Sequence, residues 1–139
     1  MSMIKKSPWI SFFNSGGCKG CGLECITLIT PKYDIERFGC VLKPSARHAD
    51  ILLVTGAMNK QTKSRLKKVY EQMAANKRVI AIGSCAISGG IFQDAYNVSK
   101  GIDKEIPVDM YVPGCPPKPE AIIDALLKVL KGLDGRKKN

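Results

Sequence analysis

Three glycine-rich turns that carry cysteines constrain this chain more than any other feature. The first turn contains Cys18 and Cys21, three residues apart; the second contains Cys85 and the third Cys115. Each turn follows an apolar run that predicts a buried strand. Because ligands of an open parallel sheet gather outside the carboxyl ends of its strands, we expect the four thiols to converge at one edge.

The remaining pattern alternates apolar strands with amphipathic helices. Strands are predicted over 9–13, 33–41, 49–55, 78–83 and 108–112. Helices are predicted from about Gly20 to before Pro31, over 62–75 and over 119–132, and a loop with at most one helical turn over 86–103. This alternation predicts an α/β fold with one doubly wound parallel sheet. We expect a single domain over 1–139, with an ordered core at 8–132 and a frayed basic tail at 133–139.

Length and composition agree with a single cytoplasmic domain. The chain has 139 residues, of which 45% are hydrophobic, enough for one core. It has no apolar run near the roughly 20 residues that span a bilayer, and its first residues do not resemble a secretory signal. Disulfide bonds are rare in the reducing cytosol, so the six cysteines are predicted to be metal ligands or buried thiols.

The net charge of +10 favours an anionic partner, which could be nucleic acid, anionic lipid or an acidic protein surface. The alternative interpretation is a solvated basic face together with the tail. A zinc-bound basic nucleic-acid module is a remote alternative, because 6% aromatic residues and one Trp offer little surface on which bases could stack. We therefore expect no nucleic-acid partner.

Four thiolates can hold one [4Fe–4S] or [2Fe–2S] cluster. Structural zinc fits less well, since it usually takes paired C-x2-C motifs close together. Two cysteines remain: Cys25 could be buried or could exchange into the cluster site, whereas Cys40 is expected to pack inside. His48 is expected at the surface or in a loop, and Trp9 in the core or at an interface.

Glu24 follows the first cysteine pair at helical spacing, which places it on the same face of the predicted helix. Two interpretations stay open. Its carboxylate could simply interact favourably with the helix dipole, or it could take up a proton when a nearby cluster gains an electron.

Three motifs resemble the small-subunit family of membrane-bound [NiFe] hydrogenases, which includes the quinone-side iron–sulfur subunit of respiratory complex I. They are C-K-G-C at 18–21 followed by Glu24, G-S-C at 83–85 followed by S-G-G at 88–90, and V-P-G-C-P-P-K-P-E at 112–120. The resemblance covers about 8–130. It implies a flavodoxin-like fold and one [4Fe–4S] cluster held by Cys18, Cys21, Cys85 and Cys115.

The spacing also points to a branch of this family. Complex I subunits carry adjacent cysteines where this chain has C-x-x-C, so it looks closer to the energy-converting hydrogenases. Uptake hydrogenase small subunits continue with ligands for further clusters, and this chain has no cysteine after Cys115. Cys25 and Cys40 match no ligand of the family.

The resemblance implies an electron-transfer subunit of an oxidoreductase complex. It would relay electrons between a ferredoxin-like iron–sulfur subunit and a catalytic large subunit, with Glu24 moving protons. Membrane-arm subunits would hold the complex at the cytoplasmic side of the membrane, where this chain would be peripheral. A membrane-bound sulfane reductase or a complex I-like quinone oxidoreductase remains the alternative.

Overall fold

The computed structural model describes residues 9–16, 20–33, 41–42, 49–73, 78–88, 90, 96, 101–102, 106–114 and 117–131, without the side chains of 42, 130 and 131. Several residues singled out by the sequence lie outside these ranges: Cys18, Cys40, His48, Cys115 and the tail 133–139. The strands are β1 (Trp9–Asn14), β2 (Val41–Leu42), β3 (Ile51–Thr55), β4 (Arg78–Ile82) and β5 (Met110–Val112). The helices are α2 (Gly20–Thr27), α3 (Lys60–Gln72), α4 (Ser84–Ser88) and α5 (Pro119–Lys131).

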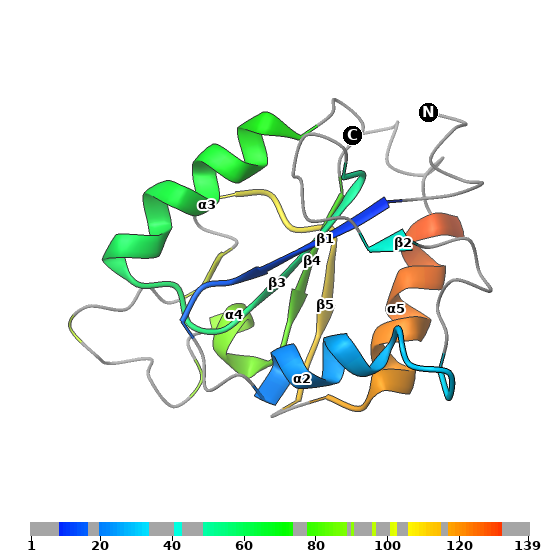
Figure 1. Cartoon of the computed structure of the whole chain (residues 1–139). Coiled ribbons are helices and arrows are strands. Elements are labelled where there is room, and N and C mark those ends of the chain that lie inside the picture. Colours follow the sequence, from blue (N-terminus) through cyan, green and yellow to red (C-terminus); the bar gives the residue numbers. More distant parts are fainter. Residues whose placement is uncertain are drawn as a thin grey trace.

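All five strands run parallel in one sheet of order β2-β1-β3-β4-β5 (Figure 1). This is the strand order of the flavodoxin-like doubly wound fold. The predicted fold class is therefore confirmed. The side chains of two aspartates help to align the strands: the Trp9 N–H donates to Asp50 Oδ2 at 3.2 Å, and the Val79 N–H donates to Asp109 Oδ2 at 2.7 Å.

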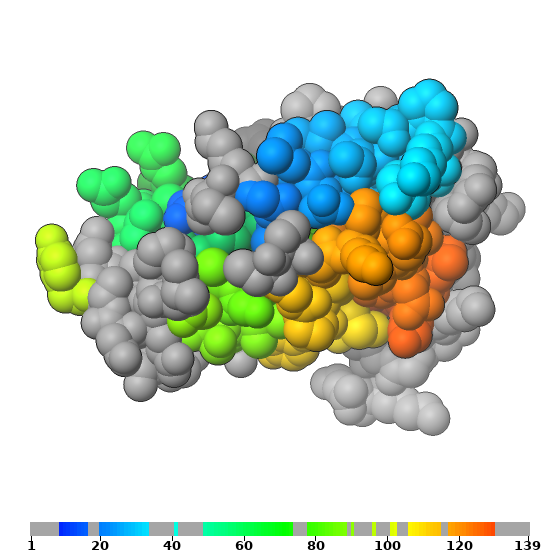
Figure 2. All heavy atoms as spheres, turned by 90° about the horizontal axis from the view of Figure 1, so that it is seen from below, coloured from blue at the N-terminus to red at the C-terminus, as the bar shows by residue number. Residues whose placement is uncertain are grey.

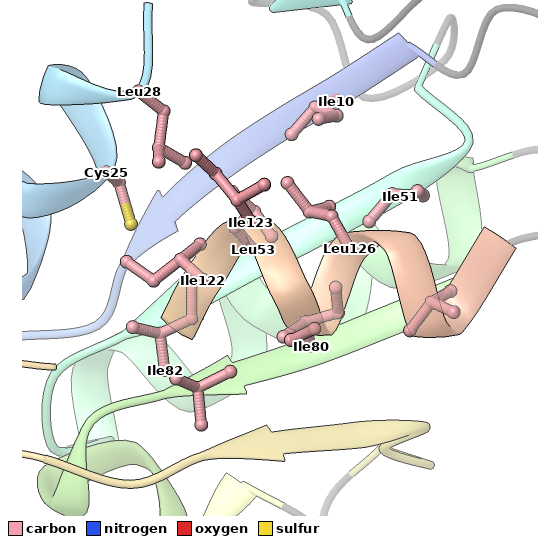
Figure 3. Close-up of a cluster of buried hydrophobic side chains, with 13 residues drawn as sticks. Ile10, Cys25, Leu28, Ile51, Leu53, Ile80, Ile82, Ile122, Ile123 and Leu126 are labelled. Carbon is pink, nitrogen blue, oxygen red and sulfur yellow. The ribbon is translucent and has the colours of Figure 1, made fainter. Parts of the chain in front are cut away.

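The central strand β3 is buried on both faces, which explains its continuous apolar sequence. Its alternate residues enter two separate cores. Ile51 and Leu53 pack toward α2 and α5 (Figure 3), whereas Leu52 and Val54 pack toward α3. The helices therefore lie in two layers, with α2 and α5 on one side of the sheet and α3 on the other (Figure 1).

Several element boundaries differ from the predictions, and the start of α3 has a clear local reason. Helix α3 begins at Lys60 rather than residue 62, because Asn59 caps it: the Thr62 N–H donates to Asn59 Oδ1 at 2.9 Å, and the Asn59 N–H donates to Thr62 Oγ1 at 3.2 Å. Of the strand predicted over 33–41, only the two ends belong to the described residues. Tyr33 lies in a turn, and Val41 begins β2.

Two helical predictions need correction. Cys85 lies in the short helix α4, not in a loop, because helical structure starts directly after Gly83. On α5, the apolar periodicity of 119–132 predicts that Ala121 belongs to the buried stripe, but Ala121 is exposed and Ile123 is buried instead. Within the described ranges, no helix combines the length and apolar character needed to span a bilayer.

Candidate metal centre

The turns after β4 and β5 are hydrogen-bonded to each other. The Gly83 N–H donates to the Val112 carbonyl at 2.7 Å, and the Ser84 N–H donates to the Gly114 carbonyl at 2.9 Å. These bonds extend the pairing of β4 and β5 beyond the strand ends. The segment that leads into Cys85 therefore lies beside the residue that precedes Cys115.

Cys21 reaches this junction from α2. A Cβ atom added to Gly83 would collide with Cys21 Sγ and would lie 3.6 Å from the Gly114 carbonyl oxygen. Gly83 also has a φ of +89°, a conformation that favours glycine. Three segments from distant parts of the chain thus meet at Gly83. Figure 2 views the molecule from below, with α2 in blue beside the orange start of α5.

Cys85 has a similar neighbour. A Cβ added to Gly90 would lie only 3.1 Å from Cys85 Sγ, so the backbone at Gly90 packs closely on this thiol. Gly114 and Pro117 also lie close together, since a Cβ on Gly114 would lie 2.6 Å from Pro117 Cα. The described parts of the second and third predicted ligand turns are therefore closely packed.

This arrangement fits an iron–sulfur cluster in its donor chemistry. Cys21 and Cys85 carry soft sulfur donors, and their sulfur atoms lie against glycine residues where backbone can approach closely. No group of three possible metal ligands occurs among the described residues. Cys18 and Cys115 lie outside them, so the four-thiolate set stays a prediction.

Cys25 is a buried thiol on the same helix as Cys21. It is 8% exposed, and Figure 3 shows it directed toward the apolar core formed with α5. Burial, aided by the charges of Cys21 and Glu24, raises the pKa of the Cys25 thiol to about 12. It is therefore a neutral thiol at pH 7, and the interpretation of Cys25 as a buried residue is confirmed. Glu24, one residue before it, is half-buried.

The outer face of α2 was missed by the sequence reasoning. Leu23 and Ile26 on α2 and Ile29 just after it are 62%, 52% and 45% exposed, although apolar residues at helical spacing predict burial; the nearby Leu28 is buried. The sequence feature that could have predicted this exposed face is the number of apolar residues, which is larger than one buried face of a short helix needs. An apolar cavity of about 30 Å³ lies between Ile26, Ile29 and the sheet residue Phe12.

Comparison with protein families gives one family match. Residues 18–129 match the family described as the 20 kDa subunit of NADH ubiquinone oxidoreductase. The chain is 50% identical, over 94% of its length and 78% of the relative, to the probable membrane-bound hydrogenase subunit mbhJ of Pyrococcus furiosus. It is also 47% identical to the chloroplastic NAD(P)H-quinone oxidoreductase subunit K of Anthoceros angustus, of which it spans about half, 48%.

Solved structures agree with the fold. A chain of the membrane-bound sulfane sulfur reductase, an archaeal respiratory membrane complex, matches with a TM-score of 0.84 and 44% identity, over 96% of this chain and 74% of that one. An NAD+-reducing [NiFe]-hydrogenase matches with a TM-score of 0.70 and 22% identity, over 91% and 92% of the two chains. The second similarity concerns the fold alone.

Proposed function

Because the chain belongs to the family of the 20 kDa subunit of NADH ubiquinone oxidoreductase, we propose that it is the electron-transfer subunit of a membrane-bound hydrogenase complex. In this proposal it holds one [4Fe–4S] cluster between a ferredoxin-like iron–sulfur subunit and a catalytic large subunit. The observation that carries the proposal is the meeting of Cys21 with the β4–β5 junction, from which Cys85 and Cys115 follow.

The chain's own contribution is to position the ligands. Cys18, Cys21, Cys85 and Cys115 would hold the cluster, which when bound supplies one-electron transfer. The hydrogen bonds from Gly83 and Ser84 keep two of the ligand turns at a fixed separation. Glycine at position 83 allows Cys21 to approach them. The bond-making chemistry would then occur in the large subunit.

The apolar face of α2 supports a partner close to this centre. Leu23 and Ile26 are exposed on the helix that carries Cys21, and Ile29 is exposed just after its end. Apolar side chains grouped beside a functional site are typical of a surface that another protein covers. We assign this face to the large subunit, because a short distance between redox centres requires the cluster to lie near the interface.

Spectroscopy of the anaerobically purified protein tests the cluster. We expect a broad absorption shoulder near about 400 nm that dithionite bleaches, as for thiolate-bound iron–sulfur clusters. Cys21→Ser should remove most of this absorption. Cys25→Ala is the matched control on the same helix and should keep it, because Cys25 points into the core. A colourless wild-type protein that contains zinc would refute the proposal.

Glu24 is proposed to move protons during turnover. It follows Cys21 by three residues on α2, a spacing that places the two residues on the same side of the helix. We expect Glu24→Gln to leave the cluster spectrum intact and to slow hydrogen turnover of the assembled complex by about tenfold or more. Glu71→Gln, an exposed carboxylate on α3, serves as control. Unchanged turnover would leave Glu24 only the helix-dipole role.

A sulfane reductase is the second candidate, favoured by the 44% identical chain of that archaeal complex. The two candidates differ in the large subunit. Two C-x-x-C pairs in its sequence would indicate the nickel–iron centre of a hydrogenase. Their absence would indicate sulfur or quinone reduction. In each case we propose peripheral attachment through membrane-arm subunits at the cytoplasmic side of the membrane.

A further inference from the structure

Helix α3 carries an unusual concentration of positive charge. Five of its thirteen residues are basic, against one acidic residue, Glu71. Four of these cations are exposed to solvent and the fifth, Lys63, is half-buried. We call these five residues the basic face: Lys60, Lys63, Arg65, Lys67 and Lys68.

The stability of the helix does not explain this distribution. The amino-terminal end of a helix is the positive end of its dipole, where acidic side chains are favourable and basic ones unfavourable. Helix α3 has no acidic residue in its first turn and no basic residue in its last turn, whereas Lys60 and Lys63 stand at its start. The charges therefore oppose the dipole, which is expected where a surface serves binding rather than folding.

The basic face starts beside Gly16, which follows β1 and leads into the first predicted ligand turn. A Cβ on Gly16 would lie 3.1 Å from Asn59 Nδ2, and Asn59 is the residue that caps α3. Lys60 follows directly. From there α3 covers the sheet face opposite α2 (Figure 1), so a partner on α2 leaves the basic face accessible.

We propose that the basic face docks the acidic surface of an iron–sulfur carrier protein that exchanges electrons with this chain; the inference rests on the proposed function. A row of cations complements carboxylates and steers an acidic protein toward the centre. The exposed positions between the cations are polar, namely Gln61 and Ser64, and they border an open hollow of about 530 Å³ with Arg65.

Two other anionic partners fit this surface less well. Helices that lie on a membrane present apolar anchors beside their cations, and the exposed positions of α3 carry none. Single-stranded nucleic acid is bound by aromatic stacking, and the one aromatic residue of α3, Tyr70, is half-buried rather than exposed. Both partners are included as outcomes of the test.

The test compares two triple variants of the full chain with equal changes in net charge. One reverses Lys60, Arg65 and Lys68 to Glu; the control reverses Arg136, Lys137 and Lys138 to Glu in the carboxyl-terminal segment. Binding to a purified acidic two-cluster ferredoxin is titrated at about 50 mM and about 300 mM sodium chloride, which span a large change in screening. Reduction of the cluster by ferredoxin and by dithionite is followed in parallel.

We expect the α3 variant to bind ferredoxin at least about tenfold more weakly at low salt, and the tail variant to change by less than about twofold. Reduction by ferredoxin should slow in the α3 variant alone, with dithionite reduction unchanged. The thermal midpoint of the α3 variant should stay close to that of the wild type, because a carboxylate at position 60 favours the helix dipole whereas one at position 68 opposes it. A structural role for the lysines would lower it.

Equal losses in both triple variants would overturn the inference, since net charge alone would then explain binding. Unchanged ferredoxin binding in the α3 variant would also overturn it. If that variant instead loses binding to phosphatidylglycerol vesicles or to an oligonucleotide, the partner is a membrane or a nucleic acid. A wild-type chain without the cluster spectrum refutes the proposed function, whereas the titration still decides whether α3 binds ferredoxin.

Discussion

Gly83→Ala is expected to abolish cluster binding, to less than about one tenth of the wild-type content, while the chain still folds. The new Cβ would collide with Cys21 Sγ, so the thiol must move away from the β4–β5 junction. The variant also strains the backbone, because Gly83 has a φ of +89°. Iron and sulfide content, with absorption near about 400 nm, measures the loss.

Gly56→Ala separates these two effects. Gly56 directly follows β3 with a φ of +83°, so alanine there causes comparable backbone strain at the end of a neighbouring strand. We expect a loss of about 1–2 kcal/mol in the free energy of unfolding and normal cluster content in the folded protein. Equal cluster loss in both variants would mean that strain, rather than the collision with Cys21, causes the defect. Full cluster content in Gly83→Ala would exclude Gly83 from the site.

Ile80→Ala should lower the free energy of unfolding by about 2–5 kcal/mol, the usual range for removing a large aliphatic side chain from a core. Ile80 is 0% exposed on β4, pairs in register with Leu53 of β3 and Met110 of β5, and belongs to the core beneath α5 (Figure 3). Urea unfolding of the protein in one defined cluster state measures the change.

Ile26→Ala is the matched control, because it removes the same atoms from a side chain that is 52% exposed. We expect a cost below about 1 kcal/mol in the isolated chain. If the face of α2 contacts the large subunit, the same variant should weaken the assembled complex. A destabilisation as large as that of Ile80→Ala would show that Ile26 belongs to the core instead.

The main elements of the fold follow from local sequence patterns. The run at 51–54 is apolar at every position, and the structure buries it, together with Thr55, on both sides of the sheet. Helix α5 starts at Pro119, where the sequence predicted it, because proline suits the first turn of a helix. The ends of helices and strands depend on individual side-chain contacts, which apolar periodicity does not predict. The Asn59 cap that extends α3 involves specific side-chain hydrogen bonds rather than apolar periodicity.

The sequence by itself determined the doubly wound sheet and named the cysteine turns, because periodicity and turn residues act over a few neighbouring positions. Only the tertiary structure decided that Gly83 makes room for Cys21, that Cys25 faces the core, and that Leu23 and Ile26 remain outside. Each of these outcomes depends on a neighbour from another element. One helix, α2, has more apolar residues than its single packed face can bury, and periodicity does not say which of them the sheet will cover.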